Sequence, residues 1–237
     1  MNRFSGEHPR TILLVGASRG LGHAMAIEFV KQGWQVVGTV RESGRTDLHT
    51  LADAHPDQVT IAPLDITEPE QISALHEQLS NRVLDILFVN SGIANRDASA
   101  PIAQVSTDEF MQVMLTNALG VMRAVDGLQD LVTADGLIGV MSSGQGSIAN
   151  NTNGGFEVYR ASKAALNQLM RSYAARHADD PRAMVLMAPG WIRTALGGPN
   201  APFSIEETIP TLVETLLAQR GKSGLRFIDR FGETVPW

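Results

Sequence analysis

The feature that most constrains this chain is a sustained alternation of short apolar runs with longer segments whose apolar residues recur at helical spacing. The first pair is the run 11–15 followed by 20–32, in which Leu21, Met25 and Phe29 share one helical face. Nearly continuous apolar runs are typical of parallel strands that helices cover on both faces. The alternation therefore predicts an α/β fold, a single-domain doubly wound parallel sheet of the Rossmann type, with about seven strands and helices on both faces.

The same pattern places the individual elements. Strands are expected at 11–15, 35–40, 59–63, 84–89, 136–141, 183–187 and 225–228, and helices at 20–32, 68–79, 107–128, 159–177 and 205–219. A chain of 237 residues suits one large domain of this kind and leaves little room for a second. We expect one domain over 1–237, with a cofactor half at about 10–130 and a catalytic and substrate half at about 131–237.

Composition excludes several classes of chemistry. Because the chain has no cysteine, disulfides, zinc–thiolate sites and thiol nucleophiles are ruled out. The six histidines are dispersed without metal-ligand spacing, so we expect no metal site. The net charge of −6 argues against nucleic-acid binding, and no apolar run approaches the roughly 18 residues of a membrane span. The polar residues 1–10 lack a signal-peptide pattern, and we expect a soluble, cytoplasmic protein that binds neither nucleic acid nor membrane.

A glycine-rich turn follows the first expected strand, with the sequence Gly-Ala-Ser-Arg-Gly-Leu-Gly at 16–22. Glycines let the backbone turn tightly and approach a pyrophosphate, and the following helix offers free N–H groups and its positive end. A turn without a ligand is the alternative, but the strand before it and the helix after it favour a dinucleotide site. The expected cofactor contacts in this turn are Gly16, Ser18, Arg19, Gly20, Leu21 and Gly22.

Tyr159 and Lys163 stand four residues apart at the start of an expected helix, so their side chains share one helical face. A free phenol has a pKa of about 10, too high for a good base at neutral pH. A nearby ammonium favours the phenolate and lowers that pKa. The pair therefore predicts a tuned acid–base, unless the spacing is coincidental and Tyr159 is simply buried. Tyr173 has no such partner and is expected in the core.

Two further polar positions stand near expected strand and helix features. Ser142 and Ser143 end the fifth expected strand, where a hydroxyl can donate a hydrogen bond to a substrate oxygen. Serines are also common turn formers after strands, so both interpretations stay open. Asn117 lies in the middle of an expected helix, an unfavourable place because the asparagine amide competes with the backbone.

The spacings Gly-x-x-x-Gly-x-Gly and Tyr-x-x-x-Lys, with the strand-end serine, resemble the short-chain dehydrogenase/reductase family from the first strand to about Thr194. The resemblance implies that Ser143, rather than Ser142, binds the substrate oxygen. It also implies that Asn117 holds a water in a proton relay with Lys163. The gap of sixteen residues between Ser143 and Tyr159 is a little longer than the family's usual gap.

The resemblance also implies cofactor contacts beyond the glycine turn. In the family, residues after the third strand contact adenine, and residues after the sixth strand hold the nicotinamide carboxamide. After the fourth strand the usual pattern is Asn-Asn-Ala-Gly, from which this chain departs at Val89 and Ser91. The implied contacts are Asp65, Ile66, Asn90, Ser91, Gly92, Pro189, Gly190, Ile192 and Thr194, together with Tyr159 and Lys163.

The residues after the second expected strand bear on the choice of cofactor. NAD binding usually needs an acidic side chain there for the ribose 2′-hydroxyl, and positions 38–40 carry none. Arg41 follows, with Arg45 nearby and Arg19 in the glycine turn, and guanidinium groups around the ribose suit a 2′-phosphate. If Glu42 faced the ribose instead of Arg41, NAD(H) would be preferred. We expect NADP(H), with NAD(H) as the alternative.

At finer detail, the segments 159–167 and 197–202 and the ending 227–237 look like the C-factor (C-signal) branch of the family, which includes carbonyl-reductase-like proteins and a bacterial signalling protein. We expect hydride transfer between NADP(H) and a small carbonyl or alcohol substrate. The alternative is a nucleotide-binding signalling or sensor protein with little or no turnover. Phe156, Trp191 and Phe203 favour an apolar or aromatic carbonyl, unless they only pack the loops. The family is commonly oligomeric, which implies a homodimer or homotetramer.

Overall fold

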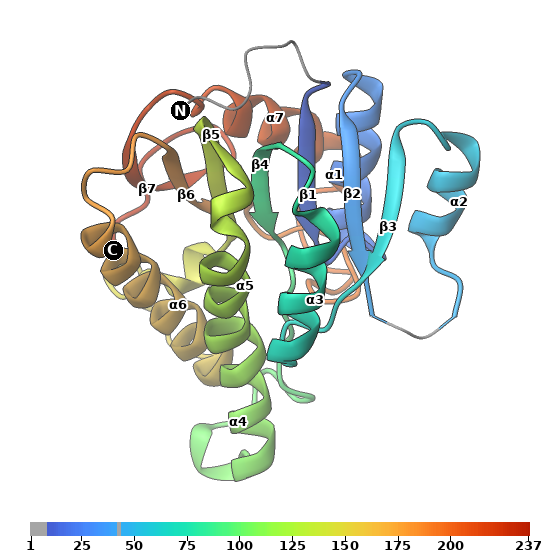
Figure 1. The fold of residues 1–237 in the computed structure, drawn as a ribbon. Coiled ribbons are helices and arrows are strands. Elements are labelled where there is room, and N and C mark those ends of the chain that lie inside the picture. The colour runs from blue at the N-terminus through green and yellow to red at the C-terminus, as the bar shows by residue number, and fades with distance from the viewer. Residues whose placement is uncertain (1–8, 42–43) are drawn as a thin grey trace.

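The structure, a computed structural model, describes residues 9–41 and 44–237. Its seven strands form one sheet in the order β3-β2-β1-β4-β5-β6-β7, and all six pairings are parallel (Figure 1). The order runs outward from β1 in both directions, so the carboxyl ends of β1 and β4 border the point where the winding reverses. Ligands of such sheets bind at that point. The predicted doubly wound parallel sheet is confirmed.

The bounds of the elements lie close to those expected, with one helix added. The strands are β1 (Thr11–Val15), β2 (Gln35–Val40), β3 (Val59–Pro63), β4 (Leu84–Val89), β5 (Val132–Met141), β6 (Ala183–Ala188) and β7 (Gly224–Asp229). The α-helices are α1 (Gly20–Lys31), α2 (Asp47–Ala54), α3 (Pro69–Leu79), α4 (Thr107–Met114), α5 (Val121–Leu128), α6 (Glu157–Arg176) and α7 (Ile205–Leu217). Helix α2 was not expected. Among the described residues, no helix is long and apolar enough to cross a membrane.

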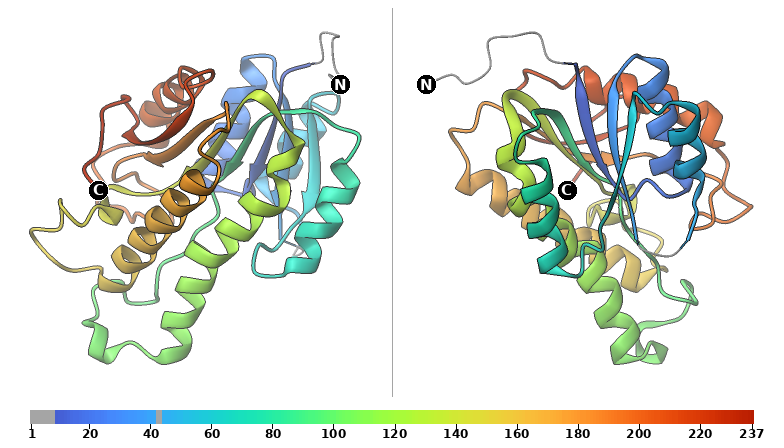
Figure 2. Two further views of the ribbon diagram at one scale, coloured as in Figure 1. Left: turned by 60° about the vertical axis from the view of Figure 1, so that its left-hand side comes forward. Right: turned by 45° about the vertical axis from the view of Figure 1, so that its right-hand side comes forward.

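Helices bury both faces of the sheet, which explains why the strands are apolar throughout (Figures 1 and 2). On one face, α3, α5 and α6 contribute Leu75, Val125 and Met170 to a buried cluster. On the other face, α1 and α7 contribute Phe29 and Leu212 to a second cluster. Apolar burial is worth roughly 25 cal/mol per Å², so these two layers supply the main stabilisation and hold the strand ends in fixed places.

The expected long helix at 107–128 is continuous but contains an irregular turn. A π-helical turn, Leu115–Gly120, joins α4 to α5. Such turns are rare and frequently lie at functional sites. The turn carries Asn117, whose side chain is completely buried. Gly120 allows close packing there, because a Cβ at this position would lie 2.9 Å from the main-chain oxygen of Ile66.

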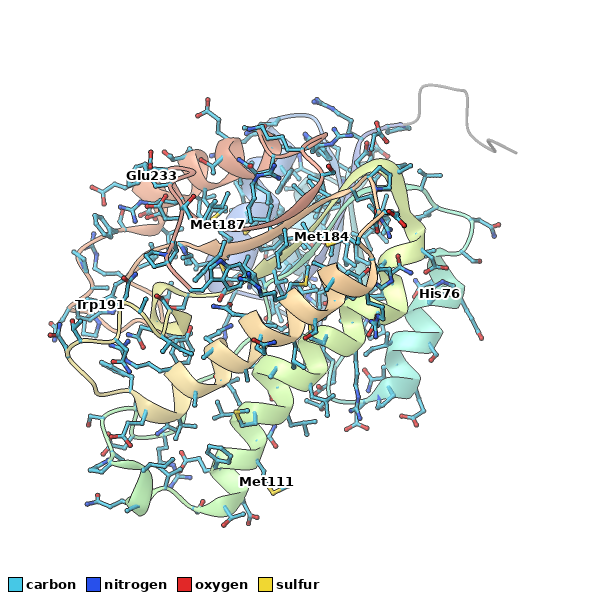
Figure 3. All side chains as sticks on the ribbon, turned by 90° about the vertical axis from the view of Figure 1, so that its left-hand side faces the viewer. His76, Met111, Met184, Met187, Trp191 and Glu233 are labelled. Atoms are coloured by element: carbon cyan, nitrogen blue, oxygen red, sulfur yellow. The ribbon has the colours of Figure 1, made fainter. Side chains whose placement is uncertain are left out.

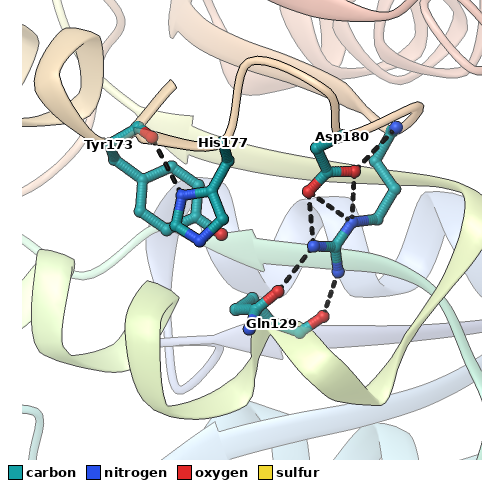
Figure 4. A network of polar contacts seen from close by, with 5 residues as sticks. Gln129, Tyr173, His177 and Asp180 are labelled. Atoms are coloured by element: carbon teal, nitrogen blue, oxygen red, sulfur yellow. Dashed lines mark hydrogen bonds and ion pairs between the residues drawn. The ribbon is translucent and has the colours of Figure 1, made fainter. Parts of the chain in front are cut away.

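A polar network lies at the amino ends of the strands, around the start of β6 (Figure 4). Arg182, just before β6, donates to the carboxylate of Asp180 and to both the side-chain and main-chain oxygens of Gln129. The hydrogen bond from the Arg182 side chain holds the pKa of Asp180 below its usual value. Beside them, the ring of Tyr173 stacks on His177 at 4.2 Å between centroids, and Tyr173 is buried as predicted. The network fixes the start of β6 relative to the residues that precede β5.

Candidate active site

The glycine turn is fixed from both neighbouring strands. Gly16 has a φ of 85° and Gly20 a φ of 59°, in the left-handed region that favours glycine. Thr39 Oγ1, from β2, accepts a hydrogen bond from the N–H of Gly16 at 2.9 Å. Asn90 Nδ2, at the end of β4, donates to the main-chain oxygen of Gly16 at 2.9 Å. The turn is therefore held in one shape before any ligand binds.

Within the glycine turn, Gly16 and Gly22 are tightly packed against neighbouring atoms, whereas Gly20 has free space around its Cα. A Cβ at Gly16 would lie 2.3 Å from Ser91 Oγ, and a Cβ at Gly22 would lie 2.1 Å from the oxygen of Gly16. At Gly20, by contrast, a Cβ would meet nothing within 4 Å. Open backbone at the beginning of α1 fits the pyrophosphate of a dinucleotide, which needs close approach to N–H groups.

Gly16→Ala tests this packing. We expect it to weaken NADPH binding at least about tenfold and to lower the free energy of unfolding by about 1–3 kcal/mol, because the added Cβ overlaps Ser91 and strains the backbone. Titration with NADPH and thermal unfolding measure the two effects. Gly33→Ala is the matched control, since Gly33 has a φ of 77° but open space around it. Equal NADPH affinity in the two variants would show that the packing of the turn is irrelevant to the cofactor.

Helix α6 presents Tyr159 and Lys163 on one face, as their spacing predicts. Lys163 Nζ lies 5.8 Å from the centroid of the Tyr159 ring. The same Nζ donates to the main-chain oxygen of Met141, the last residue of β5, at 2.9 Å. Lys163 is 2% exposed, so its ammonium is an almost completely buried cation next to the phenol.

The protonation of this pair differs from the expectation. Burial raises the pKa of Tyr159 to about 12, and a hydrogen bond with Ser143 opposes the rise. Burial lowers the pKa of Lys163 to about 8. In the chain without cofactor the pKa of Tyr159 therefore lies above its usual value rather than below it, because burial disfavours the phenolate. At neutral pH the site holds a neutral phenol, ready to donate a proton, beside a charged amine.

The two serines after β5 point to different partners. Ser142 is buried and donates to Asn167 Oδ1 at 2.6 Å, while Asn167 Nδ2 donates to the oxygen of Gly146 at 3.2 Å. Ser143 is half-buried, its Oγ accepts from the N–H of Gln145 at 3.1 Å, and its side chain opposes the rise in the pKa of Tyr159. The structure thus brings Ser143, and not Ser142, to the phenol, in agreement with the sequence-based choice.

Asn117 joins the π-helical turn to two neighbouring segments. Its Oδ1 accepts from the N–H of Ile93 at 2.8 Å, and its Nδ2 donates to the oxygen of Ile93 at 2.8 Å and to Ser162 Oγ at 2.9 Å. A Cβ at Gly92 would lie 3.3 Å from Lys163 Nζ and 3.4 Å from Asn117 Oδ1, so these groups border the same space. Both amide hydrogens are engaged in bracing the site, and the predicted water relay remains a prediction.

The other expected cofactor residues occupy the carboxyl edge with varied partners. Asp65 Oδ1 accepts from the N–H and hydroxyl of Thr67 at 2.9 and 2.7 Å, so this carboxylate orders its own turn. Thr194 Oγ1 accepts from the N–H of Gly197 at 2.9 Å. The remaining members divide by burial: Ile66, Pro189 and Ile192 are buried, Ser18, Leu21, Asn90 and Ser91 half-buried, and Gly92 and Gly190 exposed.

The expected cationic residues around the ribose are only partly available. Arg19, at the beginning of α1, and Arg41, directly after β2, are both exposed at the carboxyl edge. Arg45 instead forms an ion pair with Asp53 of α2. Glu42, on which the NAD(H) alternative depends, lies outside the described residues.

Apolar side chains lie exposed on the segments that follow β5 and β6. Ile148 is 77% exposed, Trp191 53% and Leu196 52%, and Phe156 and Phe203 are also exposed. Figure 3 shows Trp191 at the periphery, beyond the strand that carries Met184 and Met187 in the interior. Exposed apolar groups gathered near a candidate site favour an apolar ligand.

Three supporting residues escaped the sequence-based prediction: Thr39, Ser162 and Asn167. Ser162 and Asn167 were readable in principle, since both lie on α6 close to Tyr159 and Lys163. Thr39 is the one hydroxyl in the apolar run of β2, which was a weaker signal. Thr39 and Ser162 hold Gly16 and Asn117 in place through hydrogen bonds, and Asn167 holds Ser142, the neighbour of Ser143.

Residues 10–203 match the short chain dehydrogenase family, and the chain belongs to that family. A putative short-chain dehydrogenase/reductase from Burkholderia multivorans with bound NADP is 63% identical, with 97% of this chain and 100% of that one covered and a TM-score of 0.96. A carbonyl reductase from Pseudomonas aeruginosa PAO1 in complex with NADP is 32% identical, with 97% and 100% covered and a TM-score of 0.87. C-signal of Myxococcus xanthus is 30% identical over 65% of this chain and 93% of its own. The predicted resemblance to this family and to its C-factor and carbonyl-reductase-like members is confirmed.

Proposed function

We propose that this short-chain dehydrogenase transfers a hydride between NADP(H) and a carbonyl or alcohol, with Tyr159 as the proton donor and acceptor. The observation that carries the proposal is the half-buried Tyr159 side chain on the same face of α6 as the buried Lys163, with Lys163 Nζ 5.8 Å from the centroid of the Tyr159 ring. A protein that only bound a nucleotide would not need a phenol held in this way. The arrangement is suited to acid catalysis on a substrate oxygen.

The residues present fit NADP(H). The open backbone at Gly20 suits the pyrophosphate, and Arg19 and Arg41 suit a 2′-phosphate. Two related structures, at 63% and 32% identity, contain NADP. The residues proposed to hold the cofactor are Gly16, Ser18, Arg19, Gly20, Leu21, Gly22, Arg41, Asp65, Ile66, Asn90, Ser91, Gly92, Tyr159, Lys163, Pro189, Gly190, Ile192 and Thr194.

In the proposed reaction, Ser143 and Tyr159 hold the substrate oxygen between their hydroxyl groups. The nicotinamide supplies or accepts the hydride when it is bound. As negative charge develops on the oxygen, Tyr159 gives up its proton, and the Lys163 ammonium stabilises the resulting phenolate. Acid catalysis of this kind contributes about 10²–10⁴-fold, and positioning by Ser143 adds to it. In the reverse direction Tyr159 takes the proton back.

The proposal extends to organisation and substrate. We propose one domain over residues 1–237, with the cofactor half at about 10–130 and the catalytic and substrate half at about 131–237. The exposed apolar residues Ile148, Trp191 and Phe203 favour an apolar or aromatic carbonyl. We also propose a homodimer or homotetramer, because members of the family are commonly oligomeric.

Cofactor-linked turnover tests the function. The protein is incubated with NADPH or NADH and a panel of aldehydes, ketones and quinones, and cofactor oxidation is followed. We expect turnover with NADPH and apolar carbonyls, and weaker turnover with NADH. The similarity to C-signal favours a second candidate, a nucleotide-binding signalling or sensor protein. Tight NADPH binding without oxidation across the panel would favour that candidate and contradict the proposal.

A further inference from the structure

One side chain meets both ends of the segment that connects β6 to α7. Arg230, just after β7, donates from Nη1 to the main-chain oxygen of Pro189 at 3.1 Å. Its guanidinium lies 4.0 Å from the ring centroid of Phe203 and 4.4 Å from that of Phe231. The segment 190–203 therefore begins and ends against the same cation, which is held between two aromatic rings.

Gly190 makes this contact possible. A Cβ at Gly190 would lie 2.3 Å from Arg230 Nη1, and the φ of Gly190 is 95°. Any other residue would push the guanidinium away and strain the backbone. Gly190 thus leaves the space that the guanidinium of Arg230 occupies, in addition to any contact that Gly190 makes with a cofactor.

Main-chain hydrogen bonds link Phe203, at the end of the segment 190–203, to Ile192 and Arg193 near its beginning. Ile192 and Phe203 form a parallel bridge, and the N–H of Arg193 donates to the oxygen of Phe203 at 2.9 Å. Thr194 follows directly, and its oxygen accepts from the N–H of Gly198 at 2.9 Å. A shift of Phe203 would therefore move the main chain at Ile192 and Thr194.

We propose that Arg230 is a positioning residue for the nicotinamide half of the cofactor site. It acts through Pro189 and Phe203 on the main chain at Ile192 and Thr194, and touches no reacting atom. The inference rests on the proposed placement of the nicotinamide beside Ile192 and Thr194. Arg230 should have no part in binding the adenosine and pyrophosphate, for which the proposed site is the glycine turn that follows β1.

Arg230→Met, with Arg226→Met as matched control, separates the two halves of the site. Arg226 lies within β7, four residues before Arg230, and donates to the main-chain oxygens of Lys222 and Ser223 at the start of the strand. Binding is measured for NADP⁺ and for 2′-phospho-ADP-ribose, which lacks the nicotinamide. We expect Arg230→Met to weaken NADP⁺ at least about fivefold and to leave 2′-phospho-ADP-ribose within about twofold. Arg230→Lys should recover part of the loss, and Arg226→Met should change neither.

Hydrogen exchange in the cofactor-free protein provides a second readout, independent of any ligand. The amides of Arg193 and Gly198 should exchange at least about fivefold faster in Arg230→Met, while α1 and β1 are unchanged. Phe203→Ala should have a similar effect, and combining it with Arg230→Met should add little more. Unchanged exchange at Arg193 and Gly198, or equal losses of NADP⁺ and 2′-phospho-ADP-ribose affinity, would overturn the inference. If the wild type bound neither ligand, the proposed cofactor would fail, and exchange alone would decide the role of Arg230.

Discussion

Tyr159→Phe is expected to lower kcat for carbonyl reduction by at least about 10³-fold, while the Kd of NADPH changes by less than about threefold. The substitution removes the phenolic hydroxyl that would donate the proton but keeps the ring beside Lys163. Cofactor binding is expected to depend mainly on the glycine turn at residues 16–22. Thr39 and Asn90, not Tyr159, hold that turn in shape. Steady-state kinetics with the best carbonyl of the panel and a fluorescence titration with NADPH measure the two quantities.

Tyr173→Phe is the matched control for that variant. Tyr173 is also a buried tyrosine of α6, and its Oη has no hydrogen-bond partner within the described part of the chain. Its removal should leave kcat unchanged and leave stability equal or about 1 kcal/mol higher, because an unsatisfied buried hydroxyl is costly. A Tyr159→Phe enzyme that kept more than about a tenth of the wild-type kcat would show that another group donates the proton.

Lys163→Met is expected to raise the stability of the cofactor-free protein while it lowers kcat by at least about 10²-fold. Lowering the pKa of Lys163 from 10.5 to about 8 corresponds to a burial cost of about 3 kcal/mol. Losing the hydrogen bond to the oxygen of Met141 costs about 1–2 kcal/mol in return. The variant should therefore gain about 1–2 kcal/mol in free energy of unfolding, which chemical denaturation at pH 7 measures.

The pH dependence of stability checks the cause of this gain. Between about pH 8 and 10.5 the unfolded wild type keeps the proton on Lys163 while the folded protein loses it, so stability should rise across that window. Lys163→Met should lack the rise. Lys31→Met is the control, since Lys31 is 67% exposed and pairs with Glu28 only at the surface. A Lys163→Met protein less stable than the wild type at pH 7 would mean that the ammonium is not a net burden on the fold.

Much of the fold could be predicted because burial on both faces leaves a plain apolar signal in each strand. Helix α2 was missed because it buries only Leu48, so Asp47–Ala54 has little periodicity. The first half of β5 was missed because residues 133–135 are not buried, Thr133 and Asp135 are polar, and the pairing with β4 is irregular there. In these places tertiary pairing, rather than local pattern, decides the structure.

The candidate site was predictable where local geometry controls it. Four-residue spacing was enough to place Tyr159 and Lys163 on one face of α6. Their pKa values could not be predicted, because both depend on burial that the whole fold creates. The π-helical turn around Asn117 was likewise hidden, since its apolar spacing resembles that of an ordinary helix. The contact between Arg230 and Pro189 joins residues 41 positions apart, which no local pattern reveals.

The pH dependence of kcat/KM for carbonyl reduction tests most directly whether a neutral phenol next to a charged amine performs the chemistry. The account predicts a constant value near neutral pH and a decline above about pH 8, approaching tenfold per pH unit, as Lys163 loses its proton. Tyr159, with a pKa of about 12, stays protonated throughout that decline. A value that stayed flat or rose between pH 7 and pH 10 would contradict the account, because the buried ammonium would then have no part in the reaction.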